Sequence, residues 1–258
     1  LVMGRATFDG RINPIVSGDE SAMAFTRKLP FYDAVFFTEK KNGRWTEPVN
    51  LTPFFVVDGN TYCTGLSYDG REMFVYRLDG FDGNLYVSKR VGEDWSKLVK
   101  LNDNINTKYW ESHASLSKDG KTLYFTSNRK EGYGGLDIYK SERKRGDEWG
   151  PAINLGPVIN SKYNEETPFI TGDGKTLFFS SLGHYNMGDY DIFYSSRLDN
   201  GQWSKPVNLG YPVNTTGDDL FFTPVKNGEF AYYSMYDAAE SLGLCDLYKL
   251  EVFSDLHP

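Results

Sequence analysis

The sequence predicts an all-β fold, a five-bladed β-propeller of four-stranded antiparallel blades. Three columns of residues that recur along the 258-residue chain support this prediction. Tryptophan recurs at intervals of 50, 54 and 54 residues, at Trp45, Trp95, Trp149 and Trp203. Pairs that favour tight hairpin turns recur with the same spacings, at Asp69-Gly70, Asp119-Gly120, Asp173-Gly174 and Asn227-Gly228. A short polar residue recurs at Asp33, Asn84, Asp137, Asp191 and Asp246. A period of about 40–50 residues with four strands is typical of a propeller blade.

The unit from Glu165 to Leu209 shows the repeat in its clearest form. It contains four short runs rich in aromatic and β-branched residues, separated by Gly, Asp and Asn, as expected for four successive strands. Laid over the chain, the unit predicts a single domain over residues 1–258, with repeats at about 11–51, 61–101, 111–155, 165–209 and 219–252. In the first repeat Asp19-Glu20 replaces Asp-Gly, so we expect a degraded turn there.

The fifth repeat has no tryptophan strand, which leaves its blade one strand short. Residues 1–8 precede the first repeat, and we expect them to supply the missing strand and close the ring. Closure would remove exposed sheet edges, which promote aggregation. The alternatives are a frayed N-terminus with an open ring, and a sixth blade, for which the chain lacks residues.

The third repeat carries a family resemblance. It reads Ser117-Lys118-Asp119-Gly120-Lys121-Thr122-Leu123-Tyr124-Phe125-Thr126-Ser127, followed by Leu136-Asp137-Ile138-Tyr139. This pattern resembles the TolB-type Pro-Asp (WD-like) β-propeller repeat, and the resemblance covers nearly the whole chain. The form of the repeat that runs from Trp203 through Pro206-Val207-Asn208-Leu209 is similar to propellers of Bacteroidetes cell-envelope proteins, which often accompany an OmpA-like peptidoglycan-binding domain. The resemblance implies a periplasmic or cell-envelope location. It implies little about activity, because the family includes scaffolds, binding proteins and a few enzymes.

Composition argues against two classes of partner. The net charge of −7 disfavours nucleic acid and anionic membrane surfaces, both of which attract basic proteins. No apolar run approaches the roughly 18–20 residues of a membrane-spanning helix. No signal-peptide pattern is present, which is not an argument for cytoplasm because a signal is removed on secretion. Cys63 and Cys245 lie at non-equivalent positions of the repeat, so we expect free thiols.

The start of each innermost strand supplies the candidate binding site. The residues eight positions before the turn column are Arg11, Thr61, Glu111, Glu165 and Asp219, and Glu166 follows in the next position. We expect these side chains at the rim of the central channel, where they could bind a cation, a sugar or a peptide terminus, with Arg11 as counter-charge. The alternative is a solvated channel whose charges pair locally. Trp110, Tyr163 and His184 lie in connectors and variable loops and are further candidates for ligand contact.

The other recurring residues have structural interpretations. We expect the Asp/Asn column to accept backbone N–H groups at the turn before a strand, and the tryptophans to pack between blades. No catalytic residue, metal site or cofactor is predicted: the three histidines lack metal-ligand spacing, and no Gly-x-Ser-x-Gly motif is present.

The sequence therefore favours a non-catalytic binding or scaffold module of the bacterial cell envelope, with other envelope proteins or cell-wall glycan as partners. The alternative is a carbohydrate-active hydrolase or lyase at the channel mouth, because glycoside hydrolysis needs only two opposed carboxylates. Glu111, Glu165, Glu166 and Asp219 are the acids that could supply them.

Overall fold

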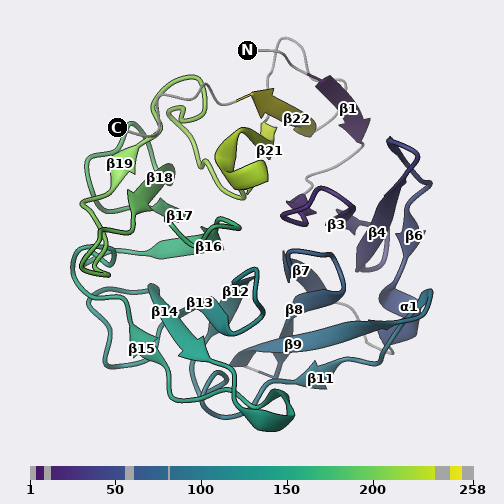
Figure 1. Ribbon diagram of the computed structural model, residues 1–258, viewed down its shortest axis with the longest axis horizontal. Helices are drawn as coiled ribbons and strands as arrows, with labels where there is room; N and C mark the ends of the chain where they lie inside the picture. Colours follow the sequence, from purple (N-terminus) through teal and green to yellow (C-terminus); the bar gives the residue numbers. More distant parts are fainter. Residues whose placement is uncertain (1–3, 9–12, 56–60, 81, 236–244, 252–258) are drawn as a thin grey trace.

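Five antiparallel sheets form a ring around a central axis in the computed structural model of this chain (Figure 1). The structure describes residues 4–8, 13–55, 61–80, 82–235 and 245–251. Helix in these residues is limited to α1 (Thr52–Phe55) and two 3-10 turns, η1 (Arg145–Asp147) and η2 (Lys226–Gly228). The predicted all-β, five-bladed propeller is confirmed.

Each of blades 1 to 4 is an antiparallel meander that begins at the channel and ends at the outer wall (Figure 1). Blade 1 contains β2 (Ile15–Val16), β3 (Ala22–Lys28), β4 (Asp33–Lys41), β5 (Arg44–Trp45) and β6 (Val49–Asn50). Blade 2 contains β7 (Thr61–Leu66), β8 (Glu72–Asp79), β9 (Asp82–Val91), β10 (Asp94–Trp95) and β11 (Val99–Lys100). Blade 3 contains β12 (Glu111–Leu116), β13 (Thr122–Ser127), β14 (Asp137–Glu142) and β15 (Ile153–Asn154). Blade 4 contains β16 (Glu165–Ile170), β17 (Thr176–Ser181), β18 (Asp191–Ser196) and β19 (Val207–Asn208).

The N-terminal strand completes the last blade, as predicted. Blade 5 contains β20 (Thr223–Val225), β21 (Phe230–Met235), β22 (Cys245–Glu251) and β1 (Gly4–Phe8). β1 pairs antiparallel with β22, from Gly4 opposite Lys249 to Phe8 opposite Cys245. The two ends of the described chain therefore meet in one sheet.

The antiparallel register places two kinds of segment at the same end of the ring. In blade 3, Glu111 pairs with Ser127, and Ser127 pairs with Asp137. The connector that leads into a blade and the loop between its second and third strands therefore lie side by side. We call this end the connector face; its described segments are 13–14, 29–32, 51–55, 80, 102–110, 128–136, 156–164, 182–190 and 210–218. The opposite end, with the first–second and third–fourth strand turns, is the hairpin face.

The first hairpin turn keeps one backbone geometry in blades 1 to 4. Gly70, Gly120 and Gly174 have φ of +67°, +71° and +69°, in the left-handed region that glycine adopts freely. Glu20 occupies this position in blade 1 with φ of +62°, and its N–H donates to the carbonyl of Ser17 at 2.8 Å. The expectation of a degraded turn is wrong, because contacts of the Glu20 side chain offset the cost of this conformation.

Those contacts join blade 1 to blade 5. The Glu20 carboxylate is buried and accepts hydrogen bonds from Tyr232 and Lys249 of blade 5. The Nζ atoms of Lys40 and Lys226 lie 3.1 and 3.8 Å from its oxygens. Burial alone would raise the pKa of Glu20, but the hydrogen bonds from Lys249, Tyr232 and Lys40 outweigh it and lower the pKa to about 2. Glu20 is therefore an ionised acid at the seam of the ring.

The core consists of apolar clusters at the interfaces between adjacent blades. The cluster between blades 1 and 2 includes Phe37 and Trp95, whose rings meet edge to face with centroids 5.0 Å apart. The cluster between blades 5 and 1 includes Leu247 and Phe25. Trp149 is buried against residues of blade 2. The prediction that the tryptophans pack between blades is confirmed.

The Asp/Asn column also has the predicted structural role in blades 3 and 4. Buried Asp137 accepts the backbone N–H groups of Tyr133 and Gly134 at 2.6 and 3.0 Å. Asp191 accepts the N–H of Met187 at 2.6 Å. These carboxylates hold the loops of the connector face against the third strands. Cys63, which we expected to be a free thiol, is free and buried. The side chain of Cys245 lies outside the described residues.

Candidate functional site

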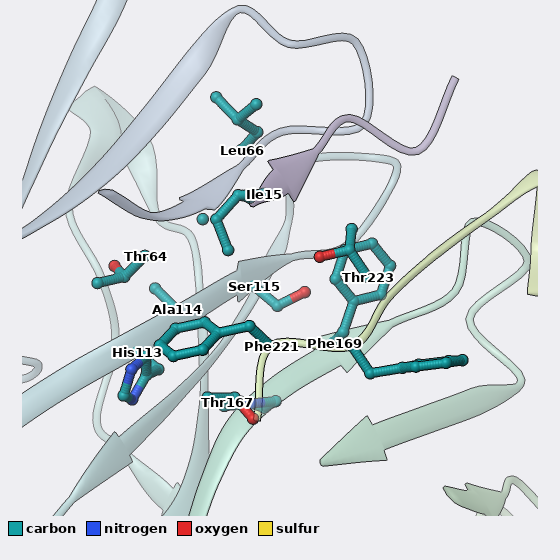
Figure 2. A pocket seen from close by; sticks show the side chains of 13 residues that line it. Ile15, Thr64, Leu66, His113, Ala114, Ser115, Thr167, Phe169, Phe221 and Thr223 are labelled. Atoms are coloured by element: carbon teal, nitrogen blue, oxygen red, sulfur yellow. The ribbon is translucent and has the colours of Figure 1, made fainter. Parts of the chain in front are cut away.

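The innermost strands surround the central channel, and their side chains nearly fill it (Figure 2). The remaining cavity has a volume of about 20 Å³, enough for one water molecule. Its walls include Ile15 of β2, Leu66 of β7, Ala114 of β12, Phe169 of β16, and Thr223 of β20. Within the described residues, this part of the channel has no room for a sugar ring or a peptide.

Two aromatic rings close the channel on the side of the connector face. His113 of blade 3 and Phe221 of blade 5 meet edge to face, with ring centroids 5.3 Å apart (Figure 2). Phe221 has φ of +60°, which a bulky residue rarely adopts. The backbone of blade 5 is therefore bent to place this ring over the channel.

A single tyrosine closes the channel on the side of the hairpin face. One repeat position supplies a residue from every blade to this opening, namely Gly18, Tyr68, Lys118, Gly172 and Lys226. A Cβ atom on Gly18 or Gly172 would lie 2.3 or 2.5 Å from atoms of the Tyr68 ring. The Nζ of Lys118 lies 4.4 Å from the centroid of that ring. The glycines therefore make room for Tyr68, which fills the space that five side chains would otherwise share.

Three of the predicted rim acids are buried rather than open to the channel. Glu111 and Glu165 are 0% exposed and Asp219 is 8% exposed. Each carboxylate accepts the backbone N–H of the residue four positions earlier; these donors are Thr107, Ser161 and Thr215, at 2.9, 2.8 and 2.5 Å. The hydroxyl groups of the same residues also donate to the carboxylates. The acids thus hold the end of each inter-blade connector, and the expected open polar ring does not form from them.

The electrostatics of these acids follow from their burial. Burial raises the pKa of all three carboxyls, of Asp219 to about 6, although the hydrogen bonds that they accept act in the opposite direction. Raised carboxyl pKa values are also found at catalytic acids. A catalytic acid must reach its substrate, however, and the oxygens of Glu111 and Glu165 are occupied by donors from the preceding connectors and from their own blades.

Glu166 points to a different set of partners. Its Oε1 accepts the hydroxyl of Tyr190 at 2.6 Å, and its Oε2 lies 3.6 Å from Nδ1 of His113. The Tyr190 oxygen accepts from Nδ2 of Asn164 at 3.0 Å. Burial lowers the pKa of His113, which favours the neutral ring, while the charge of Glu166 opposes this shift. The network joins blade 3 to blade 4 at the channel mouth.

Of the remaining predicted residues, His184 packs against its neighbours, and Trp110 and Tyr163 are exposed. Nε2 of His184 lies 2.9 Å from the carbonyl oxygen of Ile159, and its ring packs on Phe179 and Phe193. Its contacts therefore anchor its loop. Trp110 and Tyr163 are exposed on the connector face. Arg11 lies outside the described residues.

The connector face carries every exposed aromatic side chain of the described residues. Tyr185 and Tyr211 are 91% and 80% exposed. The whole set is Phe31, Tyr32, Phe54, Trp110, Tyr133, Tyr163, Tyr185 and Tyr211. No exposed aromatic residue lies on the hairpin face in the part of the chain that the structure describes.

A column of buried asparagines in the connectors was not among the predicted residues. Asn106, Asn160 and Asn214 each pair with one residue of the preceding third strand. The amide oxygen of Asn160 accepts the N–H of Ile138 at 2.8 Å, and its Nδ2 donates to the Ile138 carbonyl at 2.9 Å. Because the three asparagines are 54 residues apart, the repeat spacing itself could have revealed them.

Within the described residues, no group of three or more His, Cys, Asp or Glu side chains is placed to hold a metal ion. Among the helices in this part of the chain, none has the length and apolar character needed to cross a bilayer.

Comparison with known proteins gives a fold. No family model and no curated protein matches the chain. Among solved structures, TolB from Acinetobacter baumannii matches with a TM-score of 0.59 at 15% identity, over 93% of this chain and 54% of that chain. This chain is similar in fold to TolB. It spans about half the length of that protein.

Two hydrolases have comparable folds. An α-L-arabinofuranosidase from Lactobacillus brevis matches with a TM-score of 0.60 at 16% identity, over 95% of this chain and 91% of that chain. An α-L-arabinanase from Penicillium chrysogenum, complexed with arabinobiose, matches with a TM-score of 0.54 at 10% identity, over 96% of this chain and 98% of that chain. At such identities the similarity to TolB and to the hydrolases shows the propeller fold and nothing about activity.

Proposed function

We propose that this propeller is a non-catalytic binding or scaffold module of the bacterial cell envelope, which docks a protein or cell-wall glycan on its connector face. The observation that carries the proposal is that the eight exposed aromatic side chains of the described residues all lie on that face. Exposed apolar patches on soluble proteins mark interaction sites. Aromatic side chains are enriched at such sites because they bury a large area with few rotatable bonds.

Two described segments of the connector face, loop 128–136 and connector 156–164, hold each other in place before a partner arrives. The N–H of Gly135 donates to the carbonyl of Tyr163 at 2.9 Å, and the N–H of Leu136 donates to Oδ1 of Asn164 at 3.0 Å. A Cβ atom on Gly134 would lie 2.0 Å from the Tyr163 carbonyl oxygen, so loop 128–136 touches connector 156–164 backbone to backbone. Such pre-organisation lowers the entropic cost of binding.

The cellular setting of the proposal rests on two similarities. The sequence repeat resembles that of TolB-type and Bacteroidetes envelope propellers, and the fold is similar to that of TolB. These similarities support the proposal of a periplasmic or envelope-associated location, with envelope proteins or peptidoglycan as partners.

A carbohydrate-active hydrolase is the second candidate, because the match to the arabinofuranosidase covers nearly all of that enzyme. Glycoside hydrolysis needs two carboxylates that flank a bound sugar. The channel cavity of about 20 Å³ cannot hold one, and Glu111 and Glu165 are fully buried. These observations favour the binding module.

The test compares the wild-type protein with a Tyr185→Ser/Tyr211→Ser variant. Both residues are highly exposed, so the variant should fold normally. The matched control is Val99→Ser/Val207→Ser, which removes exposed apolar side chains from the outer wall. Co-sedimentation with insoluble peptidoglycan and quantitative pull-downs from envelope extracts report binding. We expect a partner that the wild type and the control retain and the tyrosine variant loses.

Equal retention by all three proteins would contradict docking on the connector face. Release of reducing sugar from arabinan by the wild type, abolished in Glu166→Gln, would instead support the hydrolase.

A further inference from the structure

A second surface, separate from the aromatic cluster around Tyr185 and Tyr211, lies on the outer wall between blades 1 and 2. A groove of about 380 Å³ opens there, lined by residues of β4 and β6 of blade 1 and of β9 and the following hairpin of blade 2. Figure 1 shows β4 and β6 at the right of the ring. Its volume falls in the range of about 300–1,000 Å³ that is typical of ligand pockets. Phe37 and Trp95 are buried at its base, while Val49 and Phe54 are 53% and 51% exposed at its edge.

The equivalent position between blades 2 and 3 is filled. There Arg143 donates to both carboxylate oxygens of Glu72, at 3.0 and 2.7 Å, and its guanidinium lies 4.8 Å from the centroid of the Trp149 ring. Asn102 donates to Oε2 of Glu148 at 2.6 Å and to the Trp149 carbonyl at 2.9 Å. The turn of blade 3 and its neighbouring connector thus cover the tryptophan.

The groove stays open because blade 2 differs from blade 3 in two places. Its outer hairpin is one residue shorter. In the antiparallel backbone register, Arg90 lies opposite Trp95 in blade 2, whereas Arg143 lies opposite Trp149 in blade 3. Phe54 also occupies the repeat position of Asn104, whose Nδ2 donates to the Trp149 carbonyl at 2.7 Å in the filled interface. A phenyl ring cannot make that bond, and Phe54 remains at the groove edge.

The groove carries an unbalanced negative charge. Its lining contains four carboxylates, Glu39, Glu47, Glu93 and Asp94, and two cations, Lys41 and Arg90. Both cations already have partners. Arg90 forms an ion pair with Glu39, and its guanidinium lies 5.3 Å from the centroid of the Phe37 ring. The Nζ of Lys41 lies 3.6 Å from Oε2 of Glu39. The exposed carboxylates of Glu47, Glu93 and Asp94 have no ion pair among the described residues.

We propose that this groove binds a peptide segment of a partner protein in which a large aliphatic or aromatic side chain stands next to Lys or Arg. The apolar side chain would contact Val49, Phe54 and Trp95. The cation would lie against Glu93 and Asp94. An acidic ligand or an anionic lipid headgroup is disfavoured, because the rim carboxylates repel it. Tyr185 and Tyr211 do not line the groove, whereas Phe54 belongs both to the groove and to the exposed aromatic set of the connector face.

Fluorescence anisotropy tests the proposal with defined probes. The first probe is a short fluorescein-labelled peptide with one leucine flanked by two lysines. The second replaces the lysines by glutamates, and the third replaces the leucine by serine. We expect the wild type to bind the first probe, with an affinity that falls as salt concentration rises, and to bind neither of the others.

Two variants locate the binding. Glu93→Lys/Asp94→Lys reverses two exposed charges and should weaken binding of the first probe by roughly tenfold. Phe54→Ala removes an exposed apolar contact and should weaken it by a similar factor. Asp199→Lys is the matched control, because Asp199 is an exposed acid in the equivalent hairpin of blade 4, and it should leave binding unchanged.

Thermal unfolding at the wild-type temperature would show that the charge variant is folded. Failure of the wild type to bind the lysine–leucine peptide would overturn the proposal. So would equal binding to the charge-reversed variant, or stronger binding of the glutamate peptide. Variants of Tyr185 and Tyr211 should not affect this probe, which separates the groove from the proposed function of the connector face.

Discussion

The ring of Tyr68 lies 2.5 Å from the point that a Cβ atom on Gly172 would occupy. The two residues come from blades 2 and 4, which are not neighbours in the ring. Their contact spans the channel axis and joins blades that share no interface of strands. The absence of a side chain at Gly172 is therefore a packing requirement of Tyr68.

We expect Gly172→Ala to destabilise the protein by about 1–3 kcal/mol, the usual cost of overpacking a filled site. Tyr68 cannot move aside easily, because Gly18 confines it from the blade 1 side. Urea denaturation measures the change. In a Tyr68→Ala background, which lacks the ring, the same Gly172→Ala change should destabilise the protein much less than it does in the wild type.

Gly217→Ala is the control for that cycle, since only the hydroxyl of Thr215, at 3.8 Å, lies near the new Cβ. Its effect should stay within about 0.5 kcal/mol. Additive effects of the Gly172 and Tyr68 changes would show that the two residues do not share the space.

Asn160→Ala should destabilise the protein by about 2–4 kcal/mol, because it leaves the N–H and the carbonyl of Ile138 buried without partners. Hydrogen exchange at the Ile138 amide should accelerate more than exchange elsewhere in blade 3. Asn106→Ala and Asn214→Ala should act in the same way on Leu85 and Ile192. A change confined to global stability, with no local exchange effect, would contradict the pairing.

Glu20→Gln should weaken the seam between blades 1 and 5 by about 1–3 kcal/mol at neutral pH, because a charge-assisted cluster loses its acid. The pKa of Glu20, lowered from an ordinary 4.5 to about 2, sets the pH dependence. The stabilisation is complete above the ordinary value and is lost as pH falls toward 2. The difference between wild type and variant, followed by urea denaturation, should therefore shrink over this range.

The variant Glu20→Gly distinguishes the contribution of the Glu20 carboxylate to stability from the cost of its backbone conformation. It removes the same ion pairs but relieves the positive φ of the turn. We expect it to be less destabilising than Glu20→Gln by about 0.5–1 kcal/mol. Equal losses would mean that the left-handed conformation of Glu20 costs nothing.

Asp219→Asn should have the opposite pH signature. Burial raises the pKa of Asp219 from 3.8 to about 6, so the folded state favours the protonated acid. The contribution of this acid to stability is present at low pH and is lost as pH rises from about 4 through 6. The variant should therefore gain stability relative to wild type between pH 4 and pH 8.

The ring could be predicted from the sequence because the signals for its strands and turns are local. A two-residue turn needs positive φ, and Asp-Gly at Asp69-Gly70 supplies it within a few residues. The tryptophan column and the closing strand followed from the repeat. The turn at Glu20 was wrongly expected to be degraded, because the lysines and the tyrosine that stabilise it come from other strands and, for the most part, from the other end of the chain.

The channel could not be predicted in the same way. Strand periodicity identified the positions of Glu111 and Glu165 at the start of the innermost strands, but their donors come from the preceding connector. These hydrogen bonds could be predicted from the sequence only if the serine or threonine four positions before each acid were taken as its donor. The closure by Tyr68 depends on five residues, one from each blade, that face one volume, and a repeat pattern does not tell which of them fills it.

The pairing of Gly4 with Lys249 has a mechanical consequence. The free ends of β1 and β22 lie at the same end of their ladder, so opposing forces on them would load its hydrogen bonds one after another. Such a ladder peels at lower force than one loaded in shear. Tension on the two ends would therefore open the ring at blade 5 first, while each of the other four blades, built from one continuous segment, bears no load until the seam has separated.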